Sequence, residues 1–442
     1  MKKYLFLFLM IGLLFISGCE EEKNDHECVE GTWVFQEETK CLEEGLAKLV
    51  CNECGETIEV AVKKKSHSIT IEEKEATCSE DGYYLEKCGG CDYEYLINYE
   101  KTGEHKYFYE IYTKASDNRL GTKQKKCETC KYEGNIVKYA NNGFSDHGEL
   151  SVVGPDLVDE KGEKFQLIGI STHGLQWFNK YVNYETIDAL HNEFGMNVLR
   201  LSLYTAEGGY CEADPGRKEF LYQKVVEGVK VATALDMYVI VDWHMVGAED
   251  PNDKNPMYYK DEAMEFFGRI TKEFKDYKNV LYEIMNEPNG DTTWAACKNY
   301  ANLVIPVIRE NTNGIVLVGN PHWTANLNVV MKDPLQGYEN IMYTYHFYAN
   351  GHTNQDQVKK AYDSGFPVFI SEHGGMESSG DGPIDYVSIE RWYEVLDKRN
   401  ISYVAWNLSN SKGSASILKQ ETTSLTDFSD EALKEWGVWY KA

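Results

Sequence analysis

The chain has 442 residues, of which 71 are Asp or Glu and 45 are Lys or Arg, so its formal net charge is −26. This acidic balance argues against a nucleic-acid-binding protein, because contacts with phosphates require a basic face. The length predicts two or three domains. With 42% apolar and 13% aromatic residues the chain can bury a core, which argues against general disorder.

The N-terminus is typical of an exported protein. Two lysines precede an apolar run from Tyr4 to Ile16, which suits a signal peptide and is too short to cross a bilayer. Ser17-Gly18-Cys19 follows and resembles the bacterial lipoprotein signal, in which the cysteine is lipidated and becomes the mature N-terminus. A plain signal peptide is the alternative. We expect a signal peptide over 1–18, a lipid-anchored tether over 19–25 starting at Cys19, and a location on the extracellular face of the bacterial membrane.

Residues 26–147 repeat one cysteine pattern three times. Its CxxC pairs are Cys51-Cys54, Cys88-Cys91 and Cys127-Cys130, and their first cysteines are 37 and 39 residues apart (88 − 51 and 127 − 88). A period of this size marks small tandem units. Each unit is too short to hold a sizeable core, so we expect disulfides or a bound metal ion to cross-link it.

The same residues are typical zinc ligands. The candidates are Cys41, Cys51, Cys54 and His67 in the first copy, Cys78, Cys88, Cys91 and His105 in the second, and Asp117, Cys127, Cys130 and, more loosely spaced, His147 in the third. Thiolates and imidazoles suit a closed, structural zinc site. In an exported protein the cysteines can instead pair as disulfides, and the sequence leaves both readings open. The block resembles cysteine-rich repeats of surface proteins of gut and rumen Firmicutes, which implies a spacer or adhesion role.

Residues 148–442 alternate short apolar runs with helical patterns. The predicted strands are Gln166–Ser171, Asn197–Leu203, Met237–Asp242, Val280–Met285, Gly314–Val318, Ile341–Phe347, Pro367–Ser371 and Ser402–Asn407. Amphipathic helices are predicted over Phe220–Leu235 and Asp261–Tyr277. Eight strands that each lead into a helix predict an α/β fold, a (β/α)8 TIM barrel preceded by small cysteine-rich tandem repeats. A doubly wound open sheet is the alternative, but no glycine-rich phosphate loop follows the first strand.

Polar and aromatic residues gather at the ends of these strands, where a barrel carries its active site. They are His173, Trp177, Arg200, Trp243, His244, Asn286, Glu287, His346, Tyr348, Glu372, His373 and Trp406. A single histidine after a strand is usually structural. Polar or aromatic residues at seven strand ends together indicate an active site.

Glu287 and Glu372 define the expected chemistry. They end the fourth and seventh strands, which face each other across a barrel mouth. A retaining glycosidase needs two carboxylates about 5 to 5.5 Å apart, one to protonate the leaving oxygen and one to attack the anomeric carbon. No catalytic metal or cofactor is required. Glu283 is expected to lie inside the barrel and to take no part in the chemistry.

Several motifs within residues 148–442 resemble glycoside hydrolase family 5. They are Asp242-Trp243-His244, Asn286-Glu287-Pro288, Ser371-Glu372-His373-Gly374, Trp406-Asn407 and the pair His346 and Tyr348. The resemblance implies that Glu287 is the acid/base and Glu372 the nucleophile. It further implies that Asn286 binds the sugar 2-hydroxyl and that Arg200 and Tyr348 hold the nucleophile. His244 and His346 are expected to bind sugar and to position the two catalytic glutamates. The residues expected to line the substrate cleft are His173, Trp177 and Trp406.

The resemblance is strongest to the bacterial endoglucanase subgroup, through His173-Gly174-Leu175-Gln176-Trp177 and Gly208-Gly209-Tyr210. It implies a surface-tethered endo-β-1,4-glucanase acting on a β-1,4-linked polysaccharide. A mannanase or mixed-linkage glucanase is the alternative, and a non-catalytic glycan-binding lipoprotein is disfavoured by the two glutamates. Five residues after Trp406, where relatives often have lysine, this sequence has Ser411, and Lys412 follows it. Trp323 is a further candidate sugar platform, and the pairing of Cys211 and Cys297 is left open.

Overall fold

The computed structural model describes residues 31–37, 45–52, 55–62, 67–101, 103, 105–113, 121–139 and 142–441. They belong to two compact units, one made of Met1–Phe108 with Lys125–Glu133 and the other of Tyr109–Gln124 with Gly134–Ala442. The expected signal peptide and Cys19 lie outside the described residues, as do Cys41, Cys54 and Asp117. Within the ranges just given, no helix combines the length and the apolar content needed to span a bilayer.

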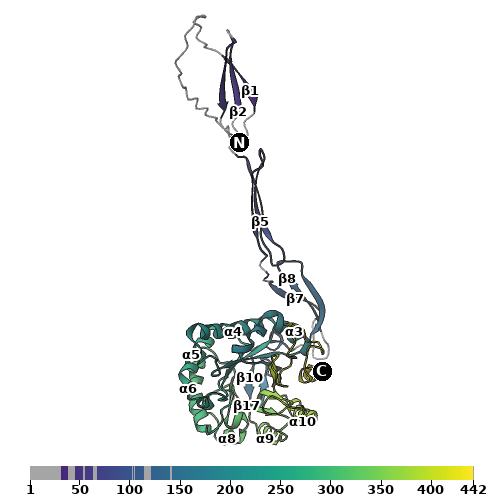
Figure 1. Ribbon diagram of the computed structural model, residues 1–442. Coiled ribbons are helices and arrows are strands. Elements are labelled where there is room, and N and C mark those ends of the chain that lie inside the picture. The colour runs from purple at the N-terminus through teal and green to yellow at the C-terminus, as the bar shows by residue number, and fades with distance from the viewer. Residues whose placement is uncertain are drawn as a thin grey trace. The chain divides into compact units, whose positions relative to one another are not determined.

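The second unit is built on a closed barrel of parallel strands (Figure 1). Its strands are β12 (Ile168–Thr172), β13 (Val198–Tyr204), β14 (Tyr238–His244), β15 (Val280–Glu283), β16 (Val316–Val318), β17 (Ile341–Tyr348), β18 (Val368–Gly374) and β19 (Tyr403–Leu408). Each strand pairs with the next along the chain, and β19 pairs with β12. This closure confirms the predicted (β/α)8 barrel and excludes the open sheet.

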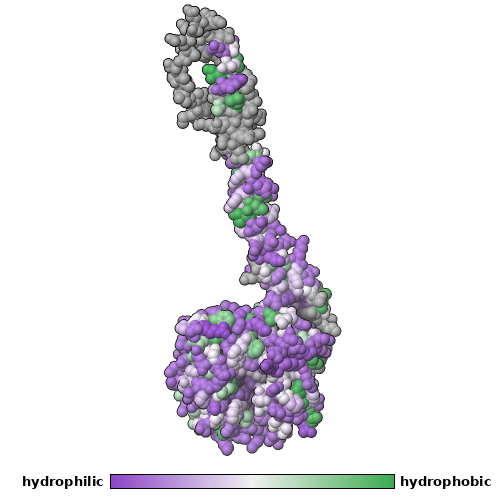
Figure 2. All heavy atoms as spheres, in the orientation of Figure 1, coloured by the Kyte–Doolittle hydropathy of each residue, from purple (hydrophilic) through white to green (hydrophobic). Residues whose placement is uncertain are grey.

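Helices surround the strands (Figure 1). The longer ones are α3 (Tyr184–Phe194), α4 (Pro215–Ala234), α5 (Lys260–Glu273), α6 (Trp294–Arg309), α9 (Asp356–Asp363) and α10 (Tyr386–Asp397). The shorter ones are α1 (Phe144–His147), α2 (Leu175–Phe178), α7 (Pro321–Thr324), α8 (Leu327–Lys332) and α11 (Glu435–Lys441). Helix α4 begins at Pro215 rather than at the predicted Phe220, because Asp214 accepts hydrogen bonds from the first free backbone N–H groups. The surface seen in Figure 2 is mostly hydrophilic over this unit, in keeping with the acidic composition.

The barrel interior has an apolar layer below a charged one. The apolar layer includes Val198, Ile240 and Leu281, and Leu157 of the hairpin β10 (Ser151–Val153) and β11 (Asp156–Val158) packs against it. Because side chains alternate along a strand, the inward residues two positions further on are Arg200, Asp242 and Glu283. All three are fully buried. Strand alternation therefore places the charged residues directly above the apolar layer, and it confirms Glu283 as an interior residue.

The unit with the barrel also contains residues that precede position 148. His147, the loosely spaced histidine of the third copy, donates from Nδ1 to Asp159 Oδ2 at 2.9 Å, and its ring stacks on Phe165. In the same unit, the Tyr109 hydroxyl donates to Asp188 of α3. His147 is therefore part of the structure around the barrel.

Before residue 142, the described part of the chain forms three three-stranded sheets. Their strands are β1 (Gly31–Glu37), β2 (Gly45–Cys51) and β3 (Thr57–Val62), then β4 (Ile69–Lys74), β5 (Gly82–Cys88) and β6 (Glu94–Tyr99), then β7 (Tyr107–Thr113), β8 (Gly121–Cys127) and β9 (Glu133–Tyr139). The central strand of each sheet ends at the first cysteine of a CxxC pair. The repeated sequence pattern thus corresponds to a repeated strand arrangement.

Candidate active site

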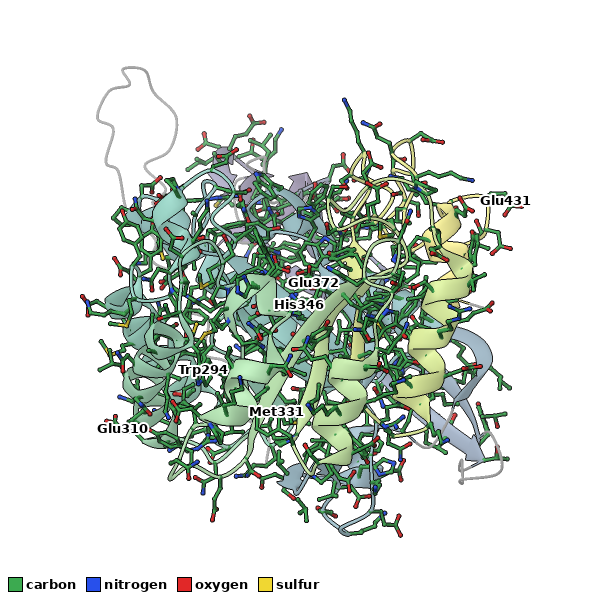
Figure 3. The ribbon with its side chains drawn as sticks, turned by 90° about the horizontal axis from the view of Figure 1, so that it is seen from below. Trp294, Glu310, Met331, His346, Glu372 and Glu431 are labelled. Carbon is green, nitrogen blue, oxygen red and sulfur yellow. The ribbon has the colours of Figure 1, made fainter. Side chains whose placement is uncertain are left out.

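Glu287 and Glu372 meet at the carboxyl-terminal ends of the barrel strands. One carboxylate oxygen of each and one ring nitrogen of His346 lie within 4.8 Å of one another. Figure 3 shows His346 and Glu372 side by side in the middle of the barrel, whereas Glu310 and Glu431 lie at its periphery. The two glutamates are close enough to act on one bond.

A β-bulge directs Glu372 into the barrel. Thr344 of β17 pairs with Phe369, and His346 pairs with Glu372, so β18 contains one extra residue between these pairs. An extra residue changes the alternation of side chains, so that two successive ones can face the same side. Both Ser371 and Glu372 indeed contact buried interior residues. Without the bulge, Glu372 would point away from the side that Ser371 faces.

Arg200 is the centre of the charged layer. Its guanidinium nitrogens lie 3.0 Å from Asp242, 2.7 Å from Glu283 and 3.1 Å from Glu372. Burial lowers the pKa of Arg200, but these three carboxylates outweigh burial and raise the pKa above its ordinary value. Arg200 therefore stays charged, and it also donates a 2.7 Å hydrogen bond to Asn286 Oδ1.

Glu372 is held at both oxygens. Arg200 donates to Oε2, and the Tyr348 hydroxyl donates to Oε1 at 2.8 Å. Burial and the neighbouring Glu372 raise the pKa of Tyr348 well above its usual value, so the hydroxyl keeps its proton and remains a donor. The carboxylate of Glu372 is thus fixed by one cation and one neutral donor.

Glu287 is bound by His346. Nδ1 of His346 donates to Glu287 Oε1 at 2.9 Å, and Nε2 donates to Ser371 Oγ at 2.9 Å. Ser371 in turn donates to Glu283 Oε1 at 2.6 Å. Burial lowers the pKa of His346, but the bonds toward Glu283 and Glu287 prevail and raise it to about 9. His346 is therefore an imidazolium at neutral pH and donates from both nitrogens.

Asn286 is oriented by its neighbours. Its Oδ1 accepts from Arg200, and its Nδ2 donates to the Met245 carbonyl at 3.1 Å and to His244 Nε2 at 3.4 Å. His244 Nδ1 donates to Asp242 Oδ2 at 2.6 Å. Burial and the charge of Arg200 lower the pKa of His244 to about 3, so its ring is neutral. A neutral ring with its proton on Nδ1 leaves Nε2 free to accept from Asn286, which fixes the amide orientation.

Aromatic rings form one wall of the site. His173 lies 5.2 Å and His244 5.1 Å from the Trp406 ring, measured between centroids. Tyr204 stacks on His244 at 4.2 Å. Trp406 is only 7% exposed, whereas Trp177 is 46% exposed and therefore presents an open apolar face. Tyr204 was not predicted as a site residue, although it ends β13 with the same alternation as Arg200.

Trp323 lies beside the loop that carries Glu287. Its backbone N–H donates to the Pro288 carbonyl at 3.1 Å, and its indole is 53% exposed. Trp323 and its neighbours His322 and Thr324 all have φ between 52° and 62°, a left-handed conformation that costs energy for residues other than glycine. The strained turn holds an exposed ring next to Glu287.

Residues 158–412 match the family described as Cellulase (glycosyl hydrolase family 5). This chain belongs to glycosyl hydrolase family 5. It is 43% identical over 297 residues to Endoglucanase A of Butyrivibrio fibrisolvens, covering 66% of this chain and 68% of that one. It is 39% identical over 298 residues to an endoglucanase of Clostridium saccharobutylicum, covering 66% and 64%.

Solved structures of a cellulase and of an endoglucanase resemble the barrel. Cellulase Cel5C_n has 35% sequence identity and a TM-score of 0.64, over 69% of this chain and 94% of its own. The catalytic domain of Thermobifida fusca endoglucanase Cel5A has 34% identity and a TM-score of 0.63, over 67% and 97%. The chain is therefore a glycoside hydrolase, and the region that matches is the barrel.

The structure shows the state of the two barrel cysteines and the surroundings of Ser411. Cys211 and Cys297 form no disulfide, and Cys297 is fully buried in α6. Ser411, which stands where relatives often have lysine, belongs to a loop whose backbone carbonyls bind Lys434. Nζ of Lys434 lies 2.6 Å from the Ser411 carbonyl oxygen and 2.7 Å from the Gly413 carbonyl oxygen. Lys434 therefore holds this loop.

The candidate metal ligands form groups that differ from the expected ones. His67 lies with Cys88 and Cys91, and Cys78 lies with His105, Cys127 and Cys130. In each group the ligand atoms are within 4.8 Å of one another. The sequence predicted sets drawn from a single copy, whereas each group combines neighbouring copies. Cys51 belongs to neither group, and Cys41 and Cys54 lie outside the described residues.

Because His346 is protonated in the folded protein, we expect the stability to fall at alkaline pH, where His346 loses its proton. Because folding raises its pKa from 6.5 to about 9, its contribution is complete below pH 6.5 and is lost as the pH rises through 9. The loss is on the order of 3 kcal/mol. Thermal melting between pH 6 and 10 should show a steeper alkaline decline for the wild type than for His346→Asn. Parallel pH profiles of the two proteins would contradict this assignment.

Proposed function

We propose that the protein is a retaining endo-β-1,4-glucanase, with Glu372 as nucleophile and Glu287 as acid/base. The observation that carries the proposal is that one oxygen of each carboxylate lies within 4.8 Å of the other. Retaining glycosidases have carboxyl groups about 5 to 5.5 Å apart, whereas inverting ones need about 6.5 to 9.5 Å to admit a water molecule. This approach of two oxygens fits the retaining arrangement and supports double displacement.

In the first step Glu372 attacks the anomeric carbon, and Glu287 donates a proton to the leaving glycosidic oxygen. A covalent glycosyl-enzyme forms. In the second step Glu287 accepts a proton from water, which attacks the same carbon and releases Glu372. Arg200 and Tyr348 hold the two oxygens of Glu372 for attack, and His346 donates to Glu287 and orients it toward the leaving group. Asn286, fixed from both ends of its amide, would bind the sugar 2-hydroxyl.

The substrate assignment rests on the relatives and on the aromatic residues. The curated relatives named above are endoglucanases, and a Thermobifida fusca endoglucanase variant has been solved in complex with cellotetraose. Trp177 and Trp323 expose flat apolar faces that suit the C–H faces of pyranose rings, and Trp406 lies deeper beside His173 and His244. This arrangement suits a glucan chain laid across the barrel mouth.

The proposal is tested with a panel of soluble cellulose derivative, mixed-linkage glucan and mannan. We expect the cellulose derivative to lose viscosity well before many reducing ends appear, and proton NMR to detect the β anomer first. Faster hydrolysis of mannan or mixed-linkage glucan would replace the substrate assignment. A first product with the α anomer would reject double displacement, and binding without any reducing sugar would indicate a glycan-binding protein.

We further propose that Cys19 anchors the enzyme to the outer face of the bacterial membrane. The support is the apolar run Tyr4–Ile16 followed by Ser17-Gly18-Cys19. In cells of a bacterium that processes lipoproteins, the wild-type chain should fractionate with membranes and carry a lipid on Cys19. A Cys19→Ala chain that remains in the membrane fraction would refute the anchor.

A further inference from the structure

Cys78, His105, Cys127 and Cys130 converge from two neighbouring sheets. His105 precedes β7, and the CxxC pair Cys127-Cys130 begins at the last residue of β8 in the same sheet, whereas Cys78 lies between β4 and β5 of the preceding sheet. We propose that these four residues bind one structural zinc ion, which joins the two sheets. The ligand set would be three thiolates and one imidazole.

The distances within the group fit a tetrahedral zinc ion. Cys78 Sγ and Cys127 Sγ are 3.7 Å apart, and Cys130 Sγ and His105 Nδ1 are 3.5 Å apart. Zn–S bonds of about 2.3 Å and Zn–N bonds of about 2.1 Å at tetrahedral angles place two sulfurs about 3.8 Å apart and a sulfur and a nitrogen about 3.6 Å apart. A disulfide would need sulfurs about 2.05 Å apart. Three cysteines also cannot all be paired with one another, and a disulfide has no use for the imidazole.

Backbone donors favour thiolates at the CxxC turns. The N–H of Thr129 donates to Cys127 Sγ at 3.5 Å, and the N–H of Gly90 donates to Cys88 Sγ at 3.4 Å. Hydrogen bonds to sulfur stabilise its charged form, which is the form that binds metal. In these two pairs the donor is the residue two positions after the first cysteine. Both turns are thus built alike for metal binding.

The second group repeats the arrangement one sheet earlier. His67 Nδ1 lies 3.4 Å from Cys91 Sγ, and Tyr93 packs against the His67 ring at 4.9 Å. Tyr132 occupies the same place beside His105. In sequence, Cys41 precedes His67 as Cys78 precedes His105, and each is followed four residues later by a glycine.

The described residues of the sheet formed by β4, β5 and β6 bury few side chains. All six residues of β4 are exposed, β6 has no buried residue, and β5 buries Gly82, Leu85 and Cys88. A three-stranded sheet with so small a packed face is marginally stable in water. A zinc ion bound by residues of two sheets would supply the missing cross-link, since metal binding contributes directly to folding.

The test measures metal in the full chain, purified under reducing conditions without chelator. Plasma mass spectrometry should find zinc in the wild type and one equivalent less per chain in Cys127→Ser/Cys130→Ser. Cys211→Ser, which alters a cysteine of the barrel, is the matched control and should keep the wild-type content. Hydrolysis of soluble cellulose derivative reports whether each variant has a folded barrel, independently of its metal content. Absence of zinc from the wild type, or equal zinc in the double variant, would overturn the proposal.

A second measurement needs no variant. After zinc removal and addition of Co²⁺, the wild-type chain should show the visible and thiolate charge-transfer absorption of tetrahedral cobalt bound by sulfur. Absence of these bands would count against the site. Peptide mapping of the untreated chain is also decisive, because peptides joined by a disulfide between Cys78 and Cys127 would exclude the zinc site.

Discussion

Glu372→Gln and Glu287→Gln should each lower kcat on soluble cellulose derivative by at least about a thousandfold. The physical reason is that an amide can neither attack the anomeric carbon nor donate a proton to the leaving oxygen. The change removes a charge or an acidic proton with almost no change in volume, so both variants should melt as folded proteins. Reducing-sugar release under saturating substrate measures the effect.

The two variants should differ on an aryl cellobioside whose leaving group needs no proton. Glu287→Gln should still release the aryl group in a first burst, because Glu372 can attack without acid assistance. Glu372→Gln should show no burst. A burst from Glu372→Gln and none from Glu287→Gln would exchange the two roles. Glu310→Gln is the matched control, because Glu310 is an exposed residue at the end of α6 and lies at the periphery in Figure 3.

Arg200→Met should unfold more easily than the wild type by about 3 to 5 kcal/mol, because it leaves buried carboxylates without their cation. Arg200 contacts Asp242, Glu283 and Glu372, and its side chain is fully buried. Hydrolysis should fall as well, since the Oε2 atom of Glu372 loses its donor. Urea unfolding at pH 7 measures the stability.

The control for this variant is Arg269→Met. Arg269 forms a two-pronged ion pair with Glu219, at 2.6 and 2.8 Å, on the exposed surface. An exposed pair contributes only about 0 to 1 kcal/mol, so this change, which also removes the contact of the Arg269 guanidinium with the Tyr222 ring, should cost clearly less than Arg200→Met. Burial raises the pKa of Asp242 well above its ordinary value, and the charge of Arg200 opposes this rise. Burial also acts to raise the pKa of Glu283, but Arg200 and His346 outweigh it and lower that pKa to about 2. Without Arg200 both carboxyls take up protons more readily, so the deficit of Arg200→Met should shrink as the pH falls. A deficit below 1 kcal/mol at pH 7 would show that the buried network adds little.

Much of the barrel could be predicted from local pattern. All eight strands were found in order, because each is a short apolar run between helical segments. The ends were less accurate: α5 ends at Glu273 rather than Tyr277, and β15 at Glu283 rather than Met285. Helix and strand ends depend on capping and on pairing with neighbours, which periodicity does not record.

The site residues were predicted from their places at strand ends, but their partners were not. Glu283 was expected to be an interior residue without a role in the chemistry, and it is interior, yet it accepts from Arg200 and from Ser371. The pair Arg200 and Glu283 is separated by 83 residues in sequence. Such contacts depend on how far each strand is shifted against the next. A single sequence contains no direct signal for that shift.

The sequence by itself determined the order of the strands, the alternation that directs Arg200, Asp242 and Glu283 inward, and the presence of glutamates at two strand ends. Only the tertiary structure decided that Ser371 and Glu372 both face the interior, because the bulge depends on pairing between β17 and β18. It likewise decided that Cys78 lies with the CxxC pair of the next sheet instead of its own. Hydrophobic alternation is a local property, whereas register and the meeting of distant ligands depend on how whole elements pack.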